Sequence, residues 1–307
     1  MPKTTKTPIK KTAKTTVSTP VKAQAGAAKK SDSTKVLKNS GAKKTSSKKV
    51  ESTEATKLFG EAMELHLHGK LQEAWALYQE ALKIEPKYFD ALHSLGLIAA
   101  QMNDYTMAIE LFELAIAIDP LNPQAHNNMA NVLGSMGKGA EALAQYDKAI
   151  SLAPQYAEAL NNRGILLRGL HRAKEALESY NQAISINPGF VEALFNRGNV
   201  LAELNEFIPA IQSYDRVIEL NPDHAAAFNN RGVILRSLKQ TDLALINFDK
   251  AIALAPKYAE ALNNQAYVLL DLGRSKDALK SFNRALKIKP DYKAALEGKK
   301  LALTTQK

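Results

Sequence analysis

The sequence predicts an all-α protein, an α-solenoid made of seven helix–turn–helix units. Three observations indicate this fold class. A proline recurs every 34 residues, small and aromatic residues recur at the same interval, and each interval holds two stretches with helical apolar periodicity. A repeat period of about 20–50 residues is typical of solenoids and similar arrays.

The prolines set the phase of the repeat. They are Pro86, Pro120, Pro154, Pro188, Pro222, Pro256 and Pro290. Because the residue before a proline avoids the helical conformation, each proline is expected to end the second helix of its unit. Counting 34-residue units from Ala55 to Tyr292 gives seven repeats, which are residues 55–88, 89–122, 123–156, 157–190, 191–224, 225–258 and 259–292.

Three positions of the unit keep one type of residue. Position 20 is always alanine, position 24 is always tyrosine or phenylalanine, and position 8 is always glycine or alanine. In the fourth unit Ala176, Tyr180 and Ala183 fall at i, i+4 and i+7, which is one face of a helix. Gly164 lies on the preceding apolar stretch, so the two backbones are expected to approach closely, with Tyr180 filling the wedge beside them.

The turn between the two helices is expected to use the left-handed backbone conformation that often ends a helix. Its residues are Gly69, Asn103, Gly137, His171, Asn205, Lys239 and Gly273. Lys239 is the least suited to that conformation. Residues 293–307 are predicted to form a capping helix and a short end, with Lys299 and Lys300 making its outer face polar.

The N-terminal segment has a different composition. Residues 1–54 hold fourteen lysines and three acids, a net charge of +11, so the rest of the chain sums to −1. Residues 1–51 are predicted to be a disordered basic tail, because they cannot bury enough apolar surface to offset the entropy of ordering. The repeat region is expected over 52–292, with Ser52 or Thr53 as the first N-cap.

Several chemistries are excluded or disfavoured. The chain has no cysteine, which excludes disulfides and thiolate metal sites and fits a cytoplasmic location. No apolar run approaches the roughly 20 residues of a membrane span. His66 and His68 lie two apart on a predicted helix and face different ways. No catalytic residue, metal site or cofactor is therefore predicted.

The in-phase prolines, alanines and aromatic residues resemble the tetratricopeptide repeat family over residues 55–292. The resemblance implies a right-handed superhelix whose first helices line a concave groove at positions 2, 5, 6, 9, 12 and 13 of each repeat. It also implies that this groove binds an extended polypeptide. The lysine and arginine set of chaperone-binding relatives is missing here.

Position 6 holds asparagine in five consecutive repeats, a set that we call the asparagine row: Asn128, Asn162, Asn196, Asn230 and Asn264. The row resembles that of O-linked N-acetylglucosamine transferases. Since an amide both donates and accepts hydrogen bonds, it can pair with a peptide backbone of any sequence. The alternative is a structural row that bonds neighbouring helices. Position 9 adds Asn131 and Asn199, and position 12 adds Arg168 and Arg236 as groove charges.

Position 7 holds arginine in three consecutive repeats, at Arg163, Arg197 and Arg231. These side chains could form an anion-binding stripe. Alternatively, their aliphatic stems pack between helices while the guanidinium groups pair with neighbouring carboxylates, which is the interpretation we favour.

The function predicted from these patterns is a non-catalytic scaffold that binds other proteins through its groove. One alternative is electrostatic association of residues 1–50 with nucleic acid or an anionic surface, with little sequence preference. Another is substrate recognition for a glycosyltransferase that is a separate chain. A homodimer is also possible for such an array.

Overall fold

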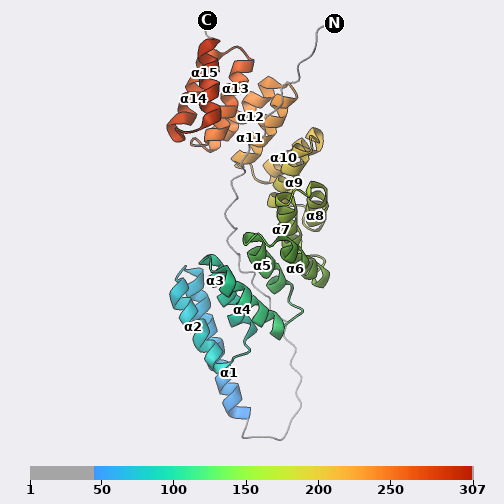
Figure 1. Cartoon of the computed structure of the whole chain (residues 1–307), viewed down its shortest axis with the longest axis vertical. Coiled ribbons are helices and arrows are strands. Elements are labelled where there is room, and N and C mark those ends of the chain that lie inside the picture. The colour runs from blue at the N-terminus through green and yellow to red at the C-terminus, as the bar shows by residue number, and fades with distance from the viewer. Residues whose placement is uncertain (1–44, 306–307) are drawn as a thin grey trace. The chain divides into compact units, whose positions relative to one another are not determined.

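The computed structural model describes residues 45–305, with side chains described from residue 53, and the predicted disorder of residues 1–51 falls almost wholly outside this range. Fifteen α-helices and no strand occur within it (Figure 1). They are α1 (Thr45–Leu67), α2 (Leu71–Ile84), α3 (Phe89–Gln101), α4 (Tyr105–Ile118), α5 (Pro123–Ser135), α6 (Gly139–Leu152), α7 (Ala157–Gly169), α8 (Ala173–Ile186), α9 (Val191–Glu203), α10 (Phe207–Leu220), α11 (Ala225–Ser237), α12 (Thr241–Leu254), α13 (Ala259–Asp271), α14 (Ser275–Ile288) and α15 (Lys293–Thr304).

The helices form seven pairs followed by a single helix, as the repeat period predicts. Odd-numbered helices up to α13 are the first helices of the repeats, and even-numbered ones are the second helices. Each helix from α2 onward packs on the next along the chain, and the first helices of neighbouring repeats also contact one another from α3 to α15. Helix α1 contacts α2 through the rings of Phe59 and Tyr78. No comparable contact joins second helices in the described part. The all-α solenoid is confirmed.

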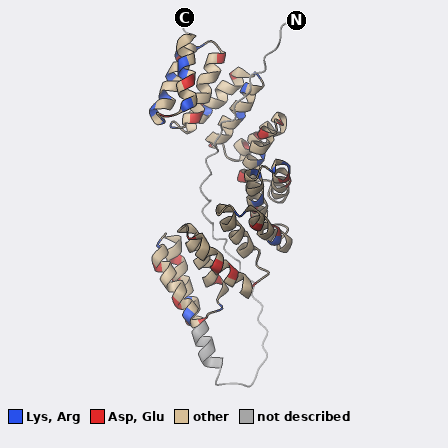
Figure 2. Ribbon diagram, viewed as in Figure 1, with Lys and Arg blue, Asp and Glu red and all other residues tan. Residues whose placement is uncertain are grey.

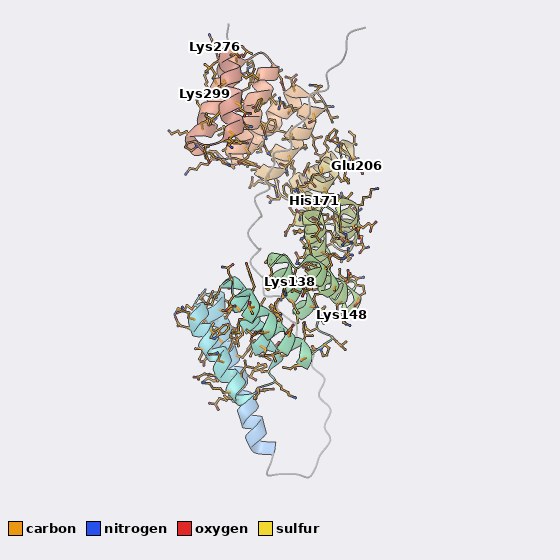
Figure 3. All side chains as sticks on the ribbon, viewed as in Figure 1. Lys138, Lys148, His171, Glu206, Lys276 and Lys299 are labelled. Atoms are coloured by element: carbon orange, nitrogen blue, oxygen red, sulfur yellow. The ribbon has the colours of Figure 1, made fainter. Side chains whose placement is uncertain are left out.

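All seven predicted turn residues adopt the left-handed conformation. The φ angle is 60° at His171, which is labelled in Figure 3, and 63° at Lys239. After α11, the amide of Lys239 donates to Arg236 O and the amide of Gln240 donates to Leu235 O, both at 2.9 Å. This pair of bonds is a Schellman motif, which satisfies the last carbonyl groups of the helix. The motif holds Lys239 in place although its side chain is poorly suited to positive φ.

The core follows the three constant positions. The aromatic residues at position 24 are all buried, with at most 3% of each side chain exposed. At Gly164 an added Cβ would lie 2.6 Å from Cε1 of Tyr180, so in this repeat the ring packs directly against the backbone of α7. The prediction that Tyr180 fills the wedge beside a small residue is confirmed.

Helix α1 begins earlier than the sequence analysis predicted. It starts at Thr45, so neither Ser52 nor Thr53 is its N-cap. The run from Lys48 to Glu51 contains good helix formers and no glycine or proline, so nothing in it stops the helix from extending toward the N-terminus.

The capping helix α15 has a mixed outer face. Lys300 is exposed as predicted, but Leu296, Leu301 and Leu303 are 41–51% exposed beside it. Positions 4 and 11, which Leu296 and Leu303 occupy, are buried in the seventh repeat as Leu262 and Leu269. They are exposed on α15 because no second helix follows it within the described residues.

Candidate functional site

The first helices share one exposed face. Positions 2, 6, 9 and 13 fall at i, i+4, i+7 and i+11, which places them on one side of a helix. In all seven repeats these positions are exposed or half-buried, and none is buried. We call this face the first-helix stripe. Because the first helices from α3 onward contact one another, their stripes form one continuous surface from the second repeat to the last. The side chain of Gln101 on α3 lies 3.1 Å from that of His66 on α1, which connects the first repeat to this surface.

The asparagine row lies in the middle of this surface and bonds each repeat to the one before it. Nδ2 of Asn162 donates to Oδ1 of Asn127 at 3.2 Å, and Nδ2 of Asn196 donates to Oδ1 of Asn161 at 3.1 Å. Asn264 bonds to Oδ1 of Asn229 in the same way, at 3.0 Å. These bonds are the ones expected if the row joins neighbouring helices, which is the alternative interpretation given above.

The remaining two members of the row are Asn128 and Asn230. The residue at position 5 of the preceding repeat determines which atom each of them bonds to. Position 5 is His93 in the second repeat, and Nδ2 of Asn128 lies 2.9 Å from its Nε2. Burial lowers the pKa of His93 to about 4, so the neutral ring can accept this bond. Position 5 is Phe195 in the fifth repeat, which cannot accept, and Asn230 bonds instead to Oδ1 of Asn199 at 2.9 Å.

Asn162 and Asn196 keep hydrogen-bonding capacity after making these bonds. Each uses one of its two N–H groups, and no other described side chain bonds to its Oδ1. Both are half-buried and therefore partly open to solvent. An amide has two donors and two acceptor lone pairs, so each of these residues can still bond to a polypeptide backbone.

Next to the capping helix, the position-5 residue Asn263 lacks the hydrogen bond that an asparagine at position 6 of the next repeat makes elsewhere. Asn263 is buried, and its Oδ1 has no hydrogen-bond partner among the described residues. The residue of α15 that corresponds to position 6 is Gly298, which has no amide to donate. An added Cβ at Gly298 would lie 2.3 Å from Cζ of Phe282, so the close contact of α15 with α14 explains the missing side chain.

A second unpartnered group is the hydroxyl of Tyr180. Tyr146 donates to Oδ1 of Asn131 at 2.5 Å and Tyr214 donates to Oδ1 of Asn199 at 2.8 Å, in each case from position 24 to position 9 of the same repeat. In the fourth repeat position 9 is Ile165, and the buried Tyr180 hydroxyl has no partner in the described structure. The predicted groove residues Asn131 and Asn199 thus also accept hydrogen bonds from buried tyrosines.

This difference predicts opposite effects of two equivalent substitutions. Tyr214→Phe removes a made hydrogen bond and should lower the free energy of unfolding by about 0.5–1.5 kcal/mol. Tyr180→Phe removes an unpaired buried hydroxyl and should leave the stability unchanged or raise it by up to about 1–3 kcal/mol. Urea unfolding followed by circular dichroism measures both. Equal losses from the two variants would contradict the assignment.

The two arginines at position 12 are paired across repeat boundaries. Arg168 donates to Oε1 of Glu203 at 3.0 Å from Nε and at 2.5 Å from Nη2, and Nε of Arg236 donates to Oδ2 of Asp271 at 2.7 Å. Each carboxylate is at position 13 of the next repeat. The predicted groove charges are therefore at the site, but each guanidinium is already neutralised by a carboxylate.

The position-7 arginines bond to second helices, away from the first-helix stripe. Arg163 donates to Asp147 at 2.7 Å and to Oγ of Ser179 at 2.8 Å. Arg197 contacts Asn181 and Ser213, and Arg231 contacts Asp215 and Asn247. Each therefore joins α6 to α8, α8 to α10 or α10 to α12, which is the structural interpretation that the sequence analysis favoured.

Comparisons with known proteins identify the class. Family models described as tetratricopeptide repeat or TPR repeat match residues 64–103, 89–122, 122–188, 172–205, 191–224 and 223–291. The chain therefore belongs to the tetratricopeptide repeat family, whose members generally mediate protein–protein interactions. The search of curated protein sequences gave no match.

Solved structures agree with this assignment. YrrB, described as a TPR protein with an unusual peptide-binding site, is 28% identical over 62% of this chain and 97% of its own, with a TM-score of 0.53. A tetratricopeptide repeat protein from Parabacteroides merdae is 18% identical over 82% of this chain and 99% of its own, with a TM-score of 0.59. PilF of Pseudomonas aeruginosa is 20% identical over 71% and 97%, with a TM-score of 0.61.

Two searches of the described residues gave negative results. No group of three or more His, Asp or Glu side chains there is arranged to hold a metal ion. Within the same residues, no helix is both long and apolar enough to cross a membrane.

Proposed function

We propose that this protein is a scaffold that binds an extended polypeptide along the first-helix stripe. The observation that carries the proposal is the continuous exposed surface of the first helices, with half-buried amides at its centre. Among the residues that the structure describes, Asn162 and Asn196 each use only one side-chain N–H, and no other side chain bonds to the Oδ1 of either. Such amides suit a ligand whose backbone is extended, since an extended backbone exposes its own N–H and C=O groups.

The likeness to YrrB supports the same use of the surface, since that relative is described as having a peptide-binding site. The resemblance of the asparagine row to the repeats of O-linked N-acetylglucosamine transferases remains a prediction. Because the row also bonds repeats together, replacing its members with alanine would affect stability and binding at once. A test of binding therefore needs residues of the stripe that hold no other repeat in place.

The serines at position 13 meet this need. Ser135 and Ser237 are exposed on the stripe, and each hydroxyl bonds only to the carbonyl oxygen four residues earlier in its own helix. Ser135→Arg with Ser237→Arg should obstruct the surface and abolish the binding of dodecapeptides selected from a displayed random library. Fluorescence anisotropy with the selected peptides measures the loss.

A matched control is available on the second helices. Ser151 and Ser185 are exposed and bond to carbonyl oxygens of their own helices, but they lie outside the stripe. Ser151→Arg with Ser185→Arg adds the same bulk and charge and should leave peptide affinity unchanged. If both double variants bind the peptides as the natural protein does, the stripe is not the peptide site.

A further inference from the structure

The second helix of the second repeat carries a row of apolar side chains on its exposed side. Met107, Leu114 and Leu121 are 39%, 54% and 69% exposed. Met107 and Leu114 lie seven residues apart on α4, which is two turns, about 10.5 Å, along one side of the helix. Leu121 follows just after the helix ends. Exposed apolar side chains that are grouped in this way indicate a contact with another molecule, whereas scattered ones are ordinary.

The other repeats show that the array does not need this row. Leu114 is at position 26, which holds a polar side chain in each of the other six repeats, namely Glu80, Lys148, Gln182, Arg216, Lys250 and Arg284. Leu121 is at position 33, where none of the other six repeats has an apolar side chain. Met107 is at position 19, which is acidic in four of the others. The row is therefore particular to the second repeat, and the packing of a repeat does not explain it.

The same side of α4 is acidic. Residues 89–122 contain five acids and no lysine or arginine, and α4 carries red bands in Figure 2. The acids at its two ends, Asp104 and Asp119, each accept a hydrogen bond from a backbone amide. The side chains of Glu110 and Glu113 are exposed and form no hydrogen bond or ion pair among the described residues, where the neighbouring ion pairs belong to the first and third repeats. We call this surface the α4 face, and it consists of Met107, Glu110, Glu113, Leu114 and Leu121.

The capping helix carries a surface of the opposite charge. Leu296 and Leu303 lie seven residues apart on α15 and are 41% and 51% exposed. Lys299, which is labelled in Figure 3, and Lys300 lie between them. Leu296, Lys300 and Leu303 are at positions 4, 8 and 11, which are buried in the seventh repeat. On α15 no second helix covers these positions within the described residues, and we call Leu296, Lys299, Lys300 and Leu303 the α15 face.

The positive charge of the α15 face is not neutralised within the described chain. Residues 274–305 hold nine lysines and arginines and three acids, a net charge of +6. The ion pairs of this segment use Arg274, Lys280 and Lys289. Lys299 and Lys300 form none. A helix that packs on the α15 face must therefore provide acceptors for these ammonium groups as well as apolar side chains for the two leucines.

The two faces have the same pattern with opposite charge. Each has apolar residues at i and i+7 and a charged residue at i+3, which is Glu110 on α4 and Lys299 on α15. Side by side, the two helices place apolar side chains on apolar ones and carboxylates beside ammonium groups. Two α4 faces, or two α15 faces, would place like charges together, which costs free energy. Within one chain α4 packs on α3 and α5, and α15 packs on α13 and α14, so the two faces meet only when they belong to different copies.

We propose that copies of this protein associate head to tail, with the α15 face of one copy packed on the α4 face of the next. Because each copy has one face of each kind, the contact is heterologous and extends beyond a pair, into a ring or an open chain of copies. Two short helices bury less than the about 1,600 Å² of a standard interface, so we expect weak association, with a Kd of roughly 10–100 μM. The inference is independent of the proposed peptide binding, since both faces lie outside the first-helix stripe.

Sedimentation velocity of the full chain tests the proposal. The mean mass should rise above the 33.5 kDa of one chain as the protein concentration increases. The rise should be smaller at high salt, because the screening length falls from about 10 Å at 0.1 M to about 3 Å at 1 M ionic strength. The mass of a single chain at every concentration up to about 500 μM, well above the expected Kd, would overturn the proposal.

A pair of matched substitutions tests the apolar part of the contact. Leu114→Lys introduces the residue that the third and sixth repeats carry at position 26, so the helix should form as before. It should raise the Kd of association at least about tenfold, because it places a buried charge among apolar side chains and faces the lysines of α15. Leu243 is 50% exposed on α12, and Leu243→Lys should leave the Kd unchanged. Equal weakening by the two substitutions would exclude the α4 face as the contact.

An exchange of charge identifies the partner of each face. The α4 variant is Glu110→Lys with Glu113→Lys, and the α15 variant is Lys299→Glu with Lys300→Glu. Each variant alone should sediment as a single chain, since like charges then face each other.

A mixture of the two variants should associate again, because every contact between an α4 variant and an α15 variant joins opposite charges. Such a rescue cannot come from variants that fail to fold. Association that either variant keeps alone would show that its face has another partner. Two variants that stay single chains in the mixture would show that α4 and α15 do not contact each other. Either result would overturn the proposal.

Discussion

Replacing Phe248 with alanine is expected to lower the free energy of unfolding by about 3–5 kcal/mol. The ring is fully buried at position 24 of the sixth repeat, where an added Cβ at Gly232 would lie 2.9 Å from Cε1. Truncation loses the apolar burial and leaves a cavity between α11 and α12. Urea unfolding measures the loss.

The control for this substitution lies two residues earlier on the same helix. Ile246 is 62% exposed, so Ile246→Ala removes an apolar side chain of similar chemistry with a change of stability within about 0.5 kcal/mol. Hydrogen exchange should also localise the effect. Because each repeat of a solenoid contacts only its neighbours, protection in Phe248→Ala should fall in α11–α14 and be retained in α3 and α4. A uniform loss along the chain would contradict this.

Gly298→Ala is expected to destabilise the C-terminal end by about 1–3 kcal/mol. The added Cβ would meet Cζ of Phe282 at 2.3 Å, which forces α15 away from α14. Hydrogen exchange of α15 should then increase more than that of any other helix. Protection of α15 equal to that in the natural protein would show that the ring can move aside without cost.

Gly169→Ala is the matched control, since it adds the same methyl group near the end of α7, where nothing lies within 4 Å. It should leave the stability unchanged or raise it by up to about 1 kcal/mol, because alanine is the better helix former. A loss in both variants would point to a general sensitivity of helix ends and not to the contact with Phe282.

The sequence predicted the fold in detail because each structural requirement recurs seven times. A single alanine at position 20 has many explanations, but seven in phase require a close helix contact. The same argument located the turns, including Lys239, whose φ of 63° no composition rule would assign to lysine. The start of α1 was wrong because it lies outside the repeat, where one stretch of ordinary helix formers has no second copy to compare.

The roles of the polar residues could not be predicted from their positions in the repeat. An asparagine at position 6 suits both a ligand and a neighbouring helix, and which bond it makes depends on the residue at position 5 of the preceding repeat. Asn230 shows the difficulty, since it bonds to position 9 because position 5 is Phe195. The net charge of −1 beyond residue 54 also gave no sign of the carboxylates at positions 2 and 13, because lysines and arginines in the turns, in α14, in α15 and at position 7 offset them in the sum.

The asparagine row has a consequence for how such an array can evolve. Its bonds run in one direction, from position 6 of one repeat to the preceding repeat, and the fourth repeat has both members of the pair, Asn161 and Asn162. Duplication of residues 157–190 in place would therefore insert a unit whose amide bonds are complete on both sides. At α15 the row is interrupted, because Gly298 has no side-chain amide to donate to Oδ1 of Asn263. New length is gained most readily by copying the middle of the array, and its end stays as it is.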